Sequence, residues 1–286
     1  MTGIPVLEIG GTHVCAAVVD GRQLVGTIQK RPLRADGTAE EFLTAVAGAA
    51  APLAADPAAT WGVAIPDPFD YARGIALFEG VGKFEALRGL DVGAALGARI
   101  GAAGFAFLND ADAFALGEWA YGAAHGTRRC VGVTLGTGVG SGWIVDGRAV
   151  AEGPGVPPDG KAHRLTVGGA PLEDRMSRRA IRAAYRASGG DPDADVAAIA
   201  AAARAGDAAA TAVLRAALGA LGAALGPCLR EFGAELLVVG GSMTGSWDLF
   251  EPWFRAAAPD LPPVAVAADA TASALAGAAR HARAGR

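Results

Sequence analysis

The residues best suited to chemistry are an amide beside a carboxylate, Asn109-Asp110, and two short turns rich in glycine and threonine. The Asn-Asp pair follows a predicted strand, 104–108, and opens a predicted helix, 111–121. A carboxylate fixed at such a junction can accept a proton from a reacting hydroxyl. An isolated Asn-Asp at a helix start is more often a simple N-cap, so the pair alone leaves both interpretations open.

The first turn is Gly10-Gly11-Thr12 and the second is Gly136-Thr137-Gly138. Glycine lets backbone N–H groups approach an anion closely, and a threonine hydroxyl adds a hydrogen bond to a phosphate oxygen. One such turn is weak evidence, because glycine hairpins are common. Two matched turns predict two hairpins that face each other across a cleft and hold a phosphate-bearing ligand from both ends.

Both turns belong to an internal repeat, in which residues 6–22 align with residues 132–148 without a gap. Each copy has an apolar strand, a Gly/Thr turn, a second apolar strand and an Asp-Gly turn. Repeats of this kind are the sequence signature of duplicated architecture. Since a whole domain separates the copies, we expect two similar halves.

Strands and helices alternate along the rest of the chain, which predicts the α/β class. The capping-box sequence Thr38-Ala-Glu-Glu41 opens a helix that extends to about residue 51. The Pro- and Gly-rich residues 152–169 are expected to form a surface loop. Further strands are expected at 24–29, 61–65, 129–135, 142–145, 235–239 and 264–267, and further helices at 92–100, 172–187, 193–205, 207–232, 247–257 and 271–282.

Charge and cysteine content exclude several kinds of protein. The formal net charge is -4 and no long run of Lys or Arg occurs, which argues against a nucleic-acid-binding surface. The three cysteines, Cys15, Cys130 and Cys228, are isolated, which argues against a disulfide framework or a structural zinc site. That usage fits a reducing cytosol.

Neither the N-terminal apolar segment nor the Ala-rich stretch at 208–225 indicates a membrane-spanning segment or a signal peptide. Acidic Glu8 interrupts the first apolar segment and no basic leader precedes it, so we expect no signal peptide. The Ala-rich residues 208–225 carry Arg and Gly and read as a buried helix rather than a membrane span. We therefore expect a cytoplasmic protein.

Four stretches together resemble the ROK family of bacterial sugar kinases, within the sugar kinase/actin/Hsp70 superfamily. They are Glu8-Ile-Gly-Gly-Thr12, similar to the family's Asp-x-Gly-Gly-Thr phosphate turn; 108–118, similar to its Asn-Asp-Ala helix; 134–142, similar to its second phosphate turn; and 239–242, similar to its Gly-Gly turn on the adenosine side. The resemblance implies an α/β protein of two actin-like (ribonuclease H-like) domains with a cleft between them. The first domain is expected at 1–108, joined by the C-terminal helix 271–286, and the second at 109–270.

The resemblance also implies ATP-dependent, glucokinase-like phosphorylation of a hydroxyl of a hexose or hexose-like substrate, with Mg²⁺. Asp110 would be the general base and Asn109 would bind the sugar beside it. Such chemistry needs positioning, charge neutralisation and one carboxylate near the nucleophile. A sugar or sugar-like polyol and a second copy of the chain, in a homodimer, are the expected partners. The nucleotide phosphates would lie against Gly10, Gly11, Thr12, Gly136, Thr137, Gly138, Gly240, Gly241 and Ser242.

Two departures from the family concern metals. Glu8 stands where the family has Asp near the metal, and its extra methylene leads us to expect Mg²⁺ contact through water. The family's cysteine-rich zinc loop is missing, and Thr166-Val-Gly-Gly-Ala-Pro171 occupies its place. We therefore predict no structural zinc.

A third departure concerns the acceptor. The family's Gly-Glu-x-Gly-His motif survives only as Gly160-Lys-Ala-His163, so His163 is either a sugar contact or a solvated loop histidine. Glu173 matches a later sugar-binding glutamate, although the dipole at a helix start also favours it there. Asp67 follows the strand 61–65 and is either a substrate contact or a turn residue. Asp159 is a candidate replacement for the lost glutamate.

Several alternatives stay open. The altered motif at 160–163 suits an amino sugar or a cyclitol of specialised metabolism as well as a hexose. Some zinc-lacking relatives use polyphosphate, but no dedicated basic track is visible and ATP is the expected donor. A sugar-sensing repressor of the family would need a helix-turn-helix before the first phosphate turn, for which we expect no room. A non-catalytic sugar-binding protein would explain Glu8 but not Asp110 and both turns.

Overall fold

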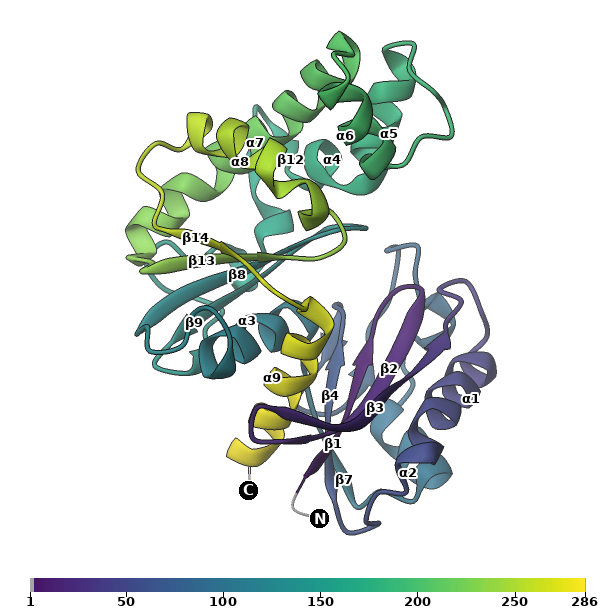
Figure 1. Ribbon diagram of the computed structural model, residues 1–286. Helices are drawn as coiled ribbons and strands as arrows, with labels where there is room; N and C mark the ends of the chain where they lie inside the picture. Colours follow the sequence, from purple (N-terminus) through teal and green to yellow (C-terminus); the bar gives the residue numbers. More distant parts are fainter. Residues whose placement is uncertain (1–2, 286) are drawn as a thin grey trace. The chain divides into compact units, whose positions relative to one another are not determined.

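Two compact units make up the part of the chain that the computed structural model describes, residues 3–285 (Figure 1). The first contains the chain up to Gly122 together with the residues from Asp269 onward, and the second is Ala123–Ala268. Each unit contains one five-stranded mixed sheet with helices packed against it. The α/β class is therefore confirmed.

In the first unit the sheet order is β3-β2-β1-β4-β7. These strands are β1 (Ile4–Ile9), β2 (His13–Asp20), β3 (Gln23–Pro32), β4 (Thr60–Ile65) and β7 (Gly104–Asn109). The first three are antiparallel neighbours, whereas β4 runs parallel to both β1 and β7. Leu7 and Ile9 belong to the core under the helices α1 (Ala39–Ala50) and α2 (Val92–Ile100). Because side chains alternate along a strand, Glu8 lies on the opposite face.

The opposite face of this sheet is covered by α9 (Ala270–Ala284), against which α3 (Asp110–Tyr121) packs. The two helices meet at backbone contact, since a Cβ on Gly117 would clash with the carbonyl of Ser273 and one on Gly277 with that of Ala113. This packing places α3 in the first unit. The division after Gly122 thus lies one helix beyond the predicted boundary at 108.

In the second unit the sheet order is β10-β9-β8-β13-β14. These strands are β8 (Arg129–Leu135), β9 (Val139–Val145), β10 (Arg148–Ala149), β13 (Leu236–Gly240) and β14 (Val264–Val266). Its helices are α4 (Glu173–Met176), α5 (Arg178–Ala187), α6 (Val196–Arg204), α7 (Ala208–Phe232) and α8 (Trp247–Ala257). The core lies between the sheet and α7 and α8, which cross one of its faces (Figure 1).

Helix α7 is long and apolar enough to cross a membrane by length and composition, the one such helix among residues 3–285. More than half of its most apolar window, 56%, is buried inside the fold. A Cβ on its Gly222 would clash with the carbonyl of Phe254 in α8, so the two helices touch along their backbones. Its apolar character is therefore used in the core of the second unit.

The two sheets share one topology, an antiparallel three-stranded meander followed by two parallel strands. The registers of their first hairpins differ by one residue. Ile9 pairs with Val14 around a turn at 10–13, whereas Leu135 pairs with Val139 around a shorter turn at 136–138. The gap-free alignment is thus right for the first strands and shifted by one residue along the second strands.

Several predicted elements differ in detail from those observed. The helix expected at 172–187 is two helices, because Ser177 is extended and its Oγ caps α5 by accepting from the N–H of Ala180 at 3.2 Å. The loop at 152–169 contains two short 3₁₀ turns, Pro158–Gly160 and Ala162–Arg164, and the strand β11 (Thr166–Val167), which pairs with β12 (Ala170–Pro171). A further small hairpin, β5 (Phe69–Asp70) with β6 (Ile75–Ala76), was not expected. The capping box at Thr38 is confirmed by both of its hydrogen bonds.

Candidate functional site

Asn109 and Asp110 lie at the junction of β7 and α3. Asn109 is the N-cap, and its Oδ1 accepts from the N–H groups of Ala111 at 3.1 Å and Asp112 at 3.4 Å. Asp110 is the first helical residue, and its Oδ1 accepts from the N–H of Ala111 at 2.9 Å. The cap role that the sequence left open is filled by Asn109, so capping does not account for the half-buried Asp110 carboxylate.

Asn109 also connects two residues that follow β4. Its Nδ2 donates to the hydroxyl of Tyr71 at 3.1 Å and to Oδ1 of Asp67 at 3.4 Å. The Tyr71 hydroxyl in turn donates to the carbonyl of Ile65 at 3.3 Å, and burial raises the pKa of this phenol. The structure therefore brings predicted Asp67 and Asn109 together. Sequence reasoning missed Tyr71, whose position depends on the unexpected hairpin β5–β6.

Glu8 lies on β1, on the face covered by α9. The pKa of its carboxyl is raised to about 7, mainly by burial and then by the negative charge of Asp110. The charge of Asp269 also raises it, whereas a hydrogen bond from Thr271 and the charge of Lys30 lower it. Its Oε2 is buried and, among residues 3–285, has no hydrogen-bond partner. A buried carboxylate oxygen without a partner, near a second carboxylate, is the kind of oxygen ligand that Mg²⁺ prefers. Glu8 therefore fits a Mg²⁺ site.

The first predicted phosphate turn is open. Gly10 donates its N–H to the carbonyl of His13 at 2.9 Å, and the exposed Thr12 has its Oγ1 3.1 Å from Nδ1 of His13. A Cβ on Gly11 would meet no atom within 4 Å, so the backbone there is accessible to a ligand. Neither glycine has a positive φ, so access rather than conformation accounts for them here.

The second predicted phosphate turn is closed by a hydrogen bond from the N–H of Gly136 to the carbonyl of Gly138, 3.1 Å. Thr137 at its tip is exposed, as Thr12 is in the first turn. A residue distant in sequence, Glu173 at the start of α4, lies beside this turn. The Glu173 carboxylate lies so close to Gly138 that a Cβ there would clash with Oε1. The predicted sugar-binding glutamate thus contacts the predicted phosphate turn.

The glycine turn after β13 lies beside this second turn. Gly241 has φ 96°, and a Cβ there would clash with the backbone of Leu135, so glycine is required on both grounds. The N–H of Met243 donates to the carbonyl of Leu135 at 3.2 Å. A Cβ on Gly136 would stand 3.4 Å from Oγ of Ser242. The structure therefore joins two turns, 136–138 and 240–242, that the sequence separates by a hundred residues.

The loop with His163 is held by a buried serine that sequence reasoning missed. Ser141 on β9 donates its hydroxyl to the carbonyl of Gly160 at 2.7 Å and accepts from the N–H of Ala162 at 2.8 Å. The indole of Trp143 also donates to this oxygen, at 3.3 Å. His163 is half-buried in the turn that follows. The available signal was a lone hydroxyl in an otherwise apolar strand.

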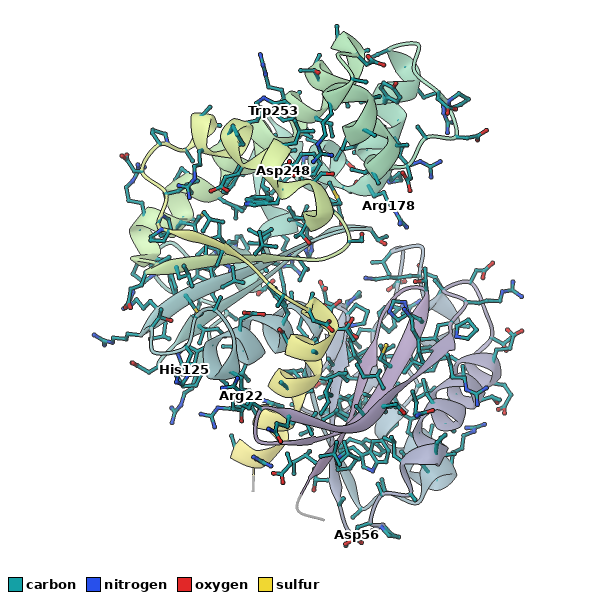
Figure 2. The ribbon with its side chains drawn as sticks, viewed as in Figure 1. Arg22, Asp56, His125, Arg178, Asp248 and Trp253 are labelled. Atoms are coloured by element: carbon teal, nitrogen blue, oxygen red, sulfur yellow. The ribbon has the colours of Figure 1, made fainter. Side chains whose placement is uncertain are left out.

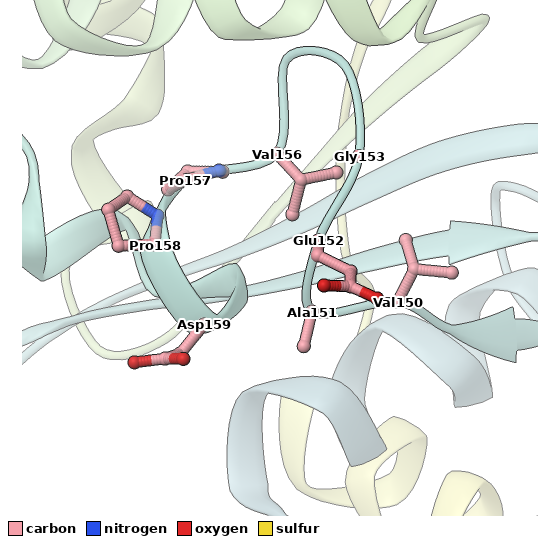
Figure 3. Close-up of a pocket in the computed structure, with 8 residues that line it drawn as sticks. All are labelled: Val150, Ala151, Glu152, Gly153, Val156, Pro157, Pro158 and Asp159. Atoms are coloured by element: carbon pink, nitrogen blue, oxygen red, sulfur yellow. The ribbon is translucent and has the colours of Figure 1, made fainter.

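Asp159 forms an ion pair with Arg164, so its carboxylate is already engaged. It lines a depression of about 730 Å³ between the two arms of the loop at 150–159 (Figure 3). Glu152 is the other acidic residue of its lining. The two carboxylates come from opposite arms, Glu152 beside Val150 and Asp159 beside Pro158.

One group of metal-ligating side chains occurs among residues 3–285, and the sequence did not predict it. Ligand atoms of Glu8, His13 and Cys15 all lie within 4.8 Å of one another. The other two cysteines lie elsewhere, Cys130 on β8 and Cys228 in α7. Only Glu8 of this group was expected near a metal.

Comparison with known proteins agrees with this architecture. The chain is 25% identical to a ROK hexokinase from Thermus thermophilus, with a TM-score of 0.80 over 99% of both chains. It is also 25% identical to a ROK family glucokinase from Streptomyces griseus, solved with glucose and AMPPNP, with a TM-score of 0.77 over 98% of this chain and 99% of that one. A protein of Bacillus subtilis (strain 168) named "Putative fructokinase" is 50% identical over 42 residues, which are 15% of this chain and only 14% of that protein.

These neighbours have the actin-like two-domain fold, and the two sheets of identical topology found here match it. Residues 5–284, nearly the whole chain, match the ROK family. The chain therefore belongs to the ROK family of sugar kinases and related proteins.

Proposed function

We propose that this protein is an ATP-dependent kinase that phosphorylates a hydroxyl of a hexose or hexose-like substrate, with Asp110 as the general base. The observation that carries the proposal is the position of Asp110, a carboxylate at the start of α3 that does not serve as the N-cap. Its negative charge raises the pKa of Glu8. The similarity to a hexokinase and to a glucokinase bound to glucose and AMPPNP supports both substrates.

In the proposed reaction the acceptor oxygen attacks the γ-phosphorus while its proton passes to Asp110. The bond between the γ-phosphorus and the bridging oxygen breaks, and ADP leaves. The N–H of Ala111 holds one oxygen of the Asp110 carboxylate at 2.9 Å and so fixes its orientation. Bound Mg²⁺, which Glu8 would hold directly or through water, neutralises phosphate charge.

We place the donor phosphates against the two turns, 10–12 and 136–138, with the exposed Thr12 and Thr137 donating their hydroxyls. In the first turn Gly11 leaves the backbone beside Gly10 accessible, whereas in the second Gly136 and Gly138 give room to Ser242 and to the carboxylate of Glu173. Ser242 and the glycines at 240–241 lie beside the second turn, and we propose that they contact the adenosine side of the nucleotide.

For the acceptor we propose Asn109, Asp67, His163 and Glu173. Asn109 and Asp67 are already in contact at 3.4 Å. In the loop at 160–163 the family's glutamate is replaced by Gly160, and neighbouring Asp159 is paired with Arg164. That pairing favours, as a second candidate, an acceptor other than glucose, such as an amino sugar or a cyclitol.

The test is a panel of hexoses, hexosamines and cyclitols assayed with ATP and Mg²⁺ for ADP release, with Asp110→Asn as the blank. We expect one acceptor class to stimulate ADP release well above the blank. Replacing ATP by polyphosphate separates the two donors. Calorimetric sugar binding without any ADP release would instead support a non-catalytic sugar-binding protein.

We also propose that the protein acts in the cytoplasm as a homodimer. None of the three cysteines forms a disulfide with another, which suits a reducing compartment. Light scattering coupled to size exclusion gives the mass in solution, and a monomer mass would contradict the dimer.

A further inference from the structure

We propose that Glu8, His13 and Cys15 form a binding site for a soft divalent cation such as Zn²⁺ or Co²⁺. Glu8 and Cys15 are directly opposite each other in the β1–β2 register, and His13 is the first residue of β2. A carboxylate oxygen, an imidazole nitrogen and the Cys15 sulfur thus lie within 4.8 Å of one another. The site is built from one hairpin of one unit.

The donor set selects the class of ion. Thiolate and imidazole ligands suit Zn²⁺ and Co²⁺, whereas Mg²⁺ prefers oxygen. Ligand atoms bound to a tetrahedral zinc are about 3.4–3.8 Å apart, from bond lengths of about 2.0–2.3 Å. Because 4.8 Å is the upper limit of their separations, the three ligand atoms need to approach one another by no more than about 1.4 Å. Water can take the fourth position, as in zinc sites with three protein ligands.

A second observation is the buried Glu8 oxygen that we also place near Mg²⁺. Oε2 of Glu8 is buried without a hydrogen-bond partner among the described residues. Buried polar atoms are nearly always satisfied, so each exception calls for an explanation such as a missing ion. A cation between Glu8 and Cys15 would satisfy it.

The surrounding charges favour a cation on balance. Asp110 on α3 and Asp269, the N-cap of α9, both act electrostatically on Glu8, and the Thr271 hydroxyl bonds to it. Lys30 on β3 is the opposing charge, since it is the register partner of Cys15. Its side chain is exposed, so it can turn away into water when an ion enters.

The protonation states of the two softer ligands fit exchangeable binding. Burial, and then Lys30, lower the pKa of His13, which keeps the imidazole in the neutral form that binds metals. Burial raises the pKa of the Cys15 thiol to about 11, so an incoming ion displaces its proton to solvent.

One consequence rests on the proposed function. Glu8 is the carboxylate that we place near Mg²⁺, and Thr12 of the first phosphate turn contacts His13 at 3.1 Å. A soft ion held by Glu8, His13 and Cys15 would take this carboxylate away from Mg²⁺. The site would then make the kinase sensitive to inhibition by Zn²⁺.

The direct test is titration of the full chain with Co²⁺ under reducing, oxygen-free conditions, read by the near-ultraviolet charge-transfer band of a cobalt thiolate. We expect one band-forming ion per chain. Cys15→Ala should abolish the band, and Cys228→Ala, the same change at the half-buried cysteine of α7, should leave it intact. His13→Ala should weaken Co²⁺ binding at least about 10-fold, since even outer partners of ligands are worth about 10–100-fold. His125→Ala, at an exposed histidine after α3 (Figure 2), is its control.

The outcomes separate cleanly. Absence of the band in the wild-type chain, or its persistence in Cys15→Ala, overturns the site. Cys15→Ser, which keeps the size of the side chain, repeats the test if the alanine variant unfolds by circular dichroism. The charge-transfer band does not depend on kinase turnover. A band in a protein without kinase activity on any acceptor would therefore support the metal site and contradict the proposed function. If the kinase is active, Zn²⁺ should inhibit it at least 10-fold less strongly in Cys15→Ala.

Discussion

The first hairpins of the two sheets, β1–β2 and β8–β9, occupy the same place in the same topology and end in the same kind of turn, yet they carry different chemistry. In the register of the structure, the opposed pair Glu8 and Cys15 corresponds to the opposed pair Thr134 and Gly140. The first hairpin thus presents an acid and a thiol where the second presents a hydroxyl and a backbone. The two hairpins thus share a topology but differ in the side chains beside their turns.

The difference extends to the rest of each unit. Asp110 and Asp67 stand in the first unit with Glu8, so most of the carboxylates that we assign to chemistry belong to it. The second unit offers mainly uncharged turns, with Glu173 beside Gly138 as the exception. The comparison predicts that removing charge matters most in the first unit and that removing hydrogen bonds matters similarly in both.

Loss of the Asp110 charge should have the largest effect. Asp110→Asn keeps the size of the side chain but removes the proton acceptor, so turnover should fall about 10²- to 10⁴-fold. Acceptor affinity should change much less, because the amide can still bond the hydroxyl. Steady-state kinetics with the best acceptor of the panel measures both.

A matched control uses the same substitution at a true helix cap of the second unit. Asp195 caps α6 by accepting from the N–H of Ala198 at 2.8 Å, and Asn caps almost equally well. Asp195→Asn should therefore leave turnover within a few-fold of the wild type. Near-normal turnover in a folded Asp110→Asn protein would contradict the base role and make Asp67 the next residue to test.

The two turns can be compared directly through Thr12→Val and Thr137→Val. Each change removes one hydroxyl proposed to bond a charged phosphate, worth about 1.5–3 kcal/mol, or about 10- to 100-fold in the KM for ATP. The KM for the acceptor should stay nearly constant. Thr166→Val, at an exposed strand position of β11, is the control. If only one variant changes the KM for ATP, the two hairpins do not share the phosphates.

Local signals made much of this fold predictable. The capping box at Thr38, the β-branched run of β8 and the Asn109-Asp110 junction each specify an element through neighbouring residues. The repeat predicted two similar halves for the same reason. The register of the second strands was not predictable, because it depends on whether a turn closes over 10–13 or over the shorter 136–138.

Partners distant in sequence were the part of the site that could not be predicted. Glu8 meets Asp269 and Thr271 only because α9 returns from the far end of the chain to cover β1. Ser141 gains its role from Gly160 and Ala162, which fold back over β9. In both cases the interacting groups belong to different elements, and no local pattern records their contact.

Ser141→Ala would give the second hairpin the residue that the first has at the equivalent core position, Ala16. The change leaves the buried carbonyl of Gly160 and N–H of Ala162 without their partner, which should lower the free energy of unfolding by about 1–3 kcal/mol. The acceptor KM should rise a few-fold, since His163 follows this turn, while the KM for ATP stays constant. Thermal unfolding and kinetics check both effects. The reverse change, Ala16→Ser, should also destabilise the protein, because it buries a hydroxyl in the apolar core. An unchanged melting temperature for Ser141→Ala would contradict the role assigned to Ser141.

The last prediction concerns the pH dependence of stability that the Glu8 carboxyl produces, and the direction of that dependence is specific. The folded protein holds the pKa of this carboxyl at about 7, against 4.5 for the ordinary group, so the folded state favours the protonated acid. The contribution of this group to stability is therefore complete below pH 4.5 and is lost as the pH rises to about 7. In metal-free buffer the melting temperature of the wild type should fall between pH 4.5 and about 7. Glu8→Gln cannot ionise, so its melting temperature should change less across the same range. Glu8→Thr, which copies Thr134 of the second hairpin, should behave like Glu8→Gln. Equal slopes in all three proteins would show that the carboxyl at this position titrates normally and that the first hairpin is less different from the second than its residues imply.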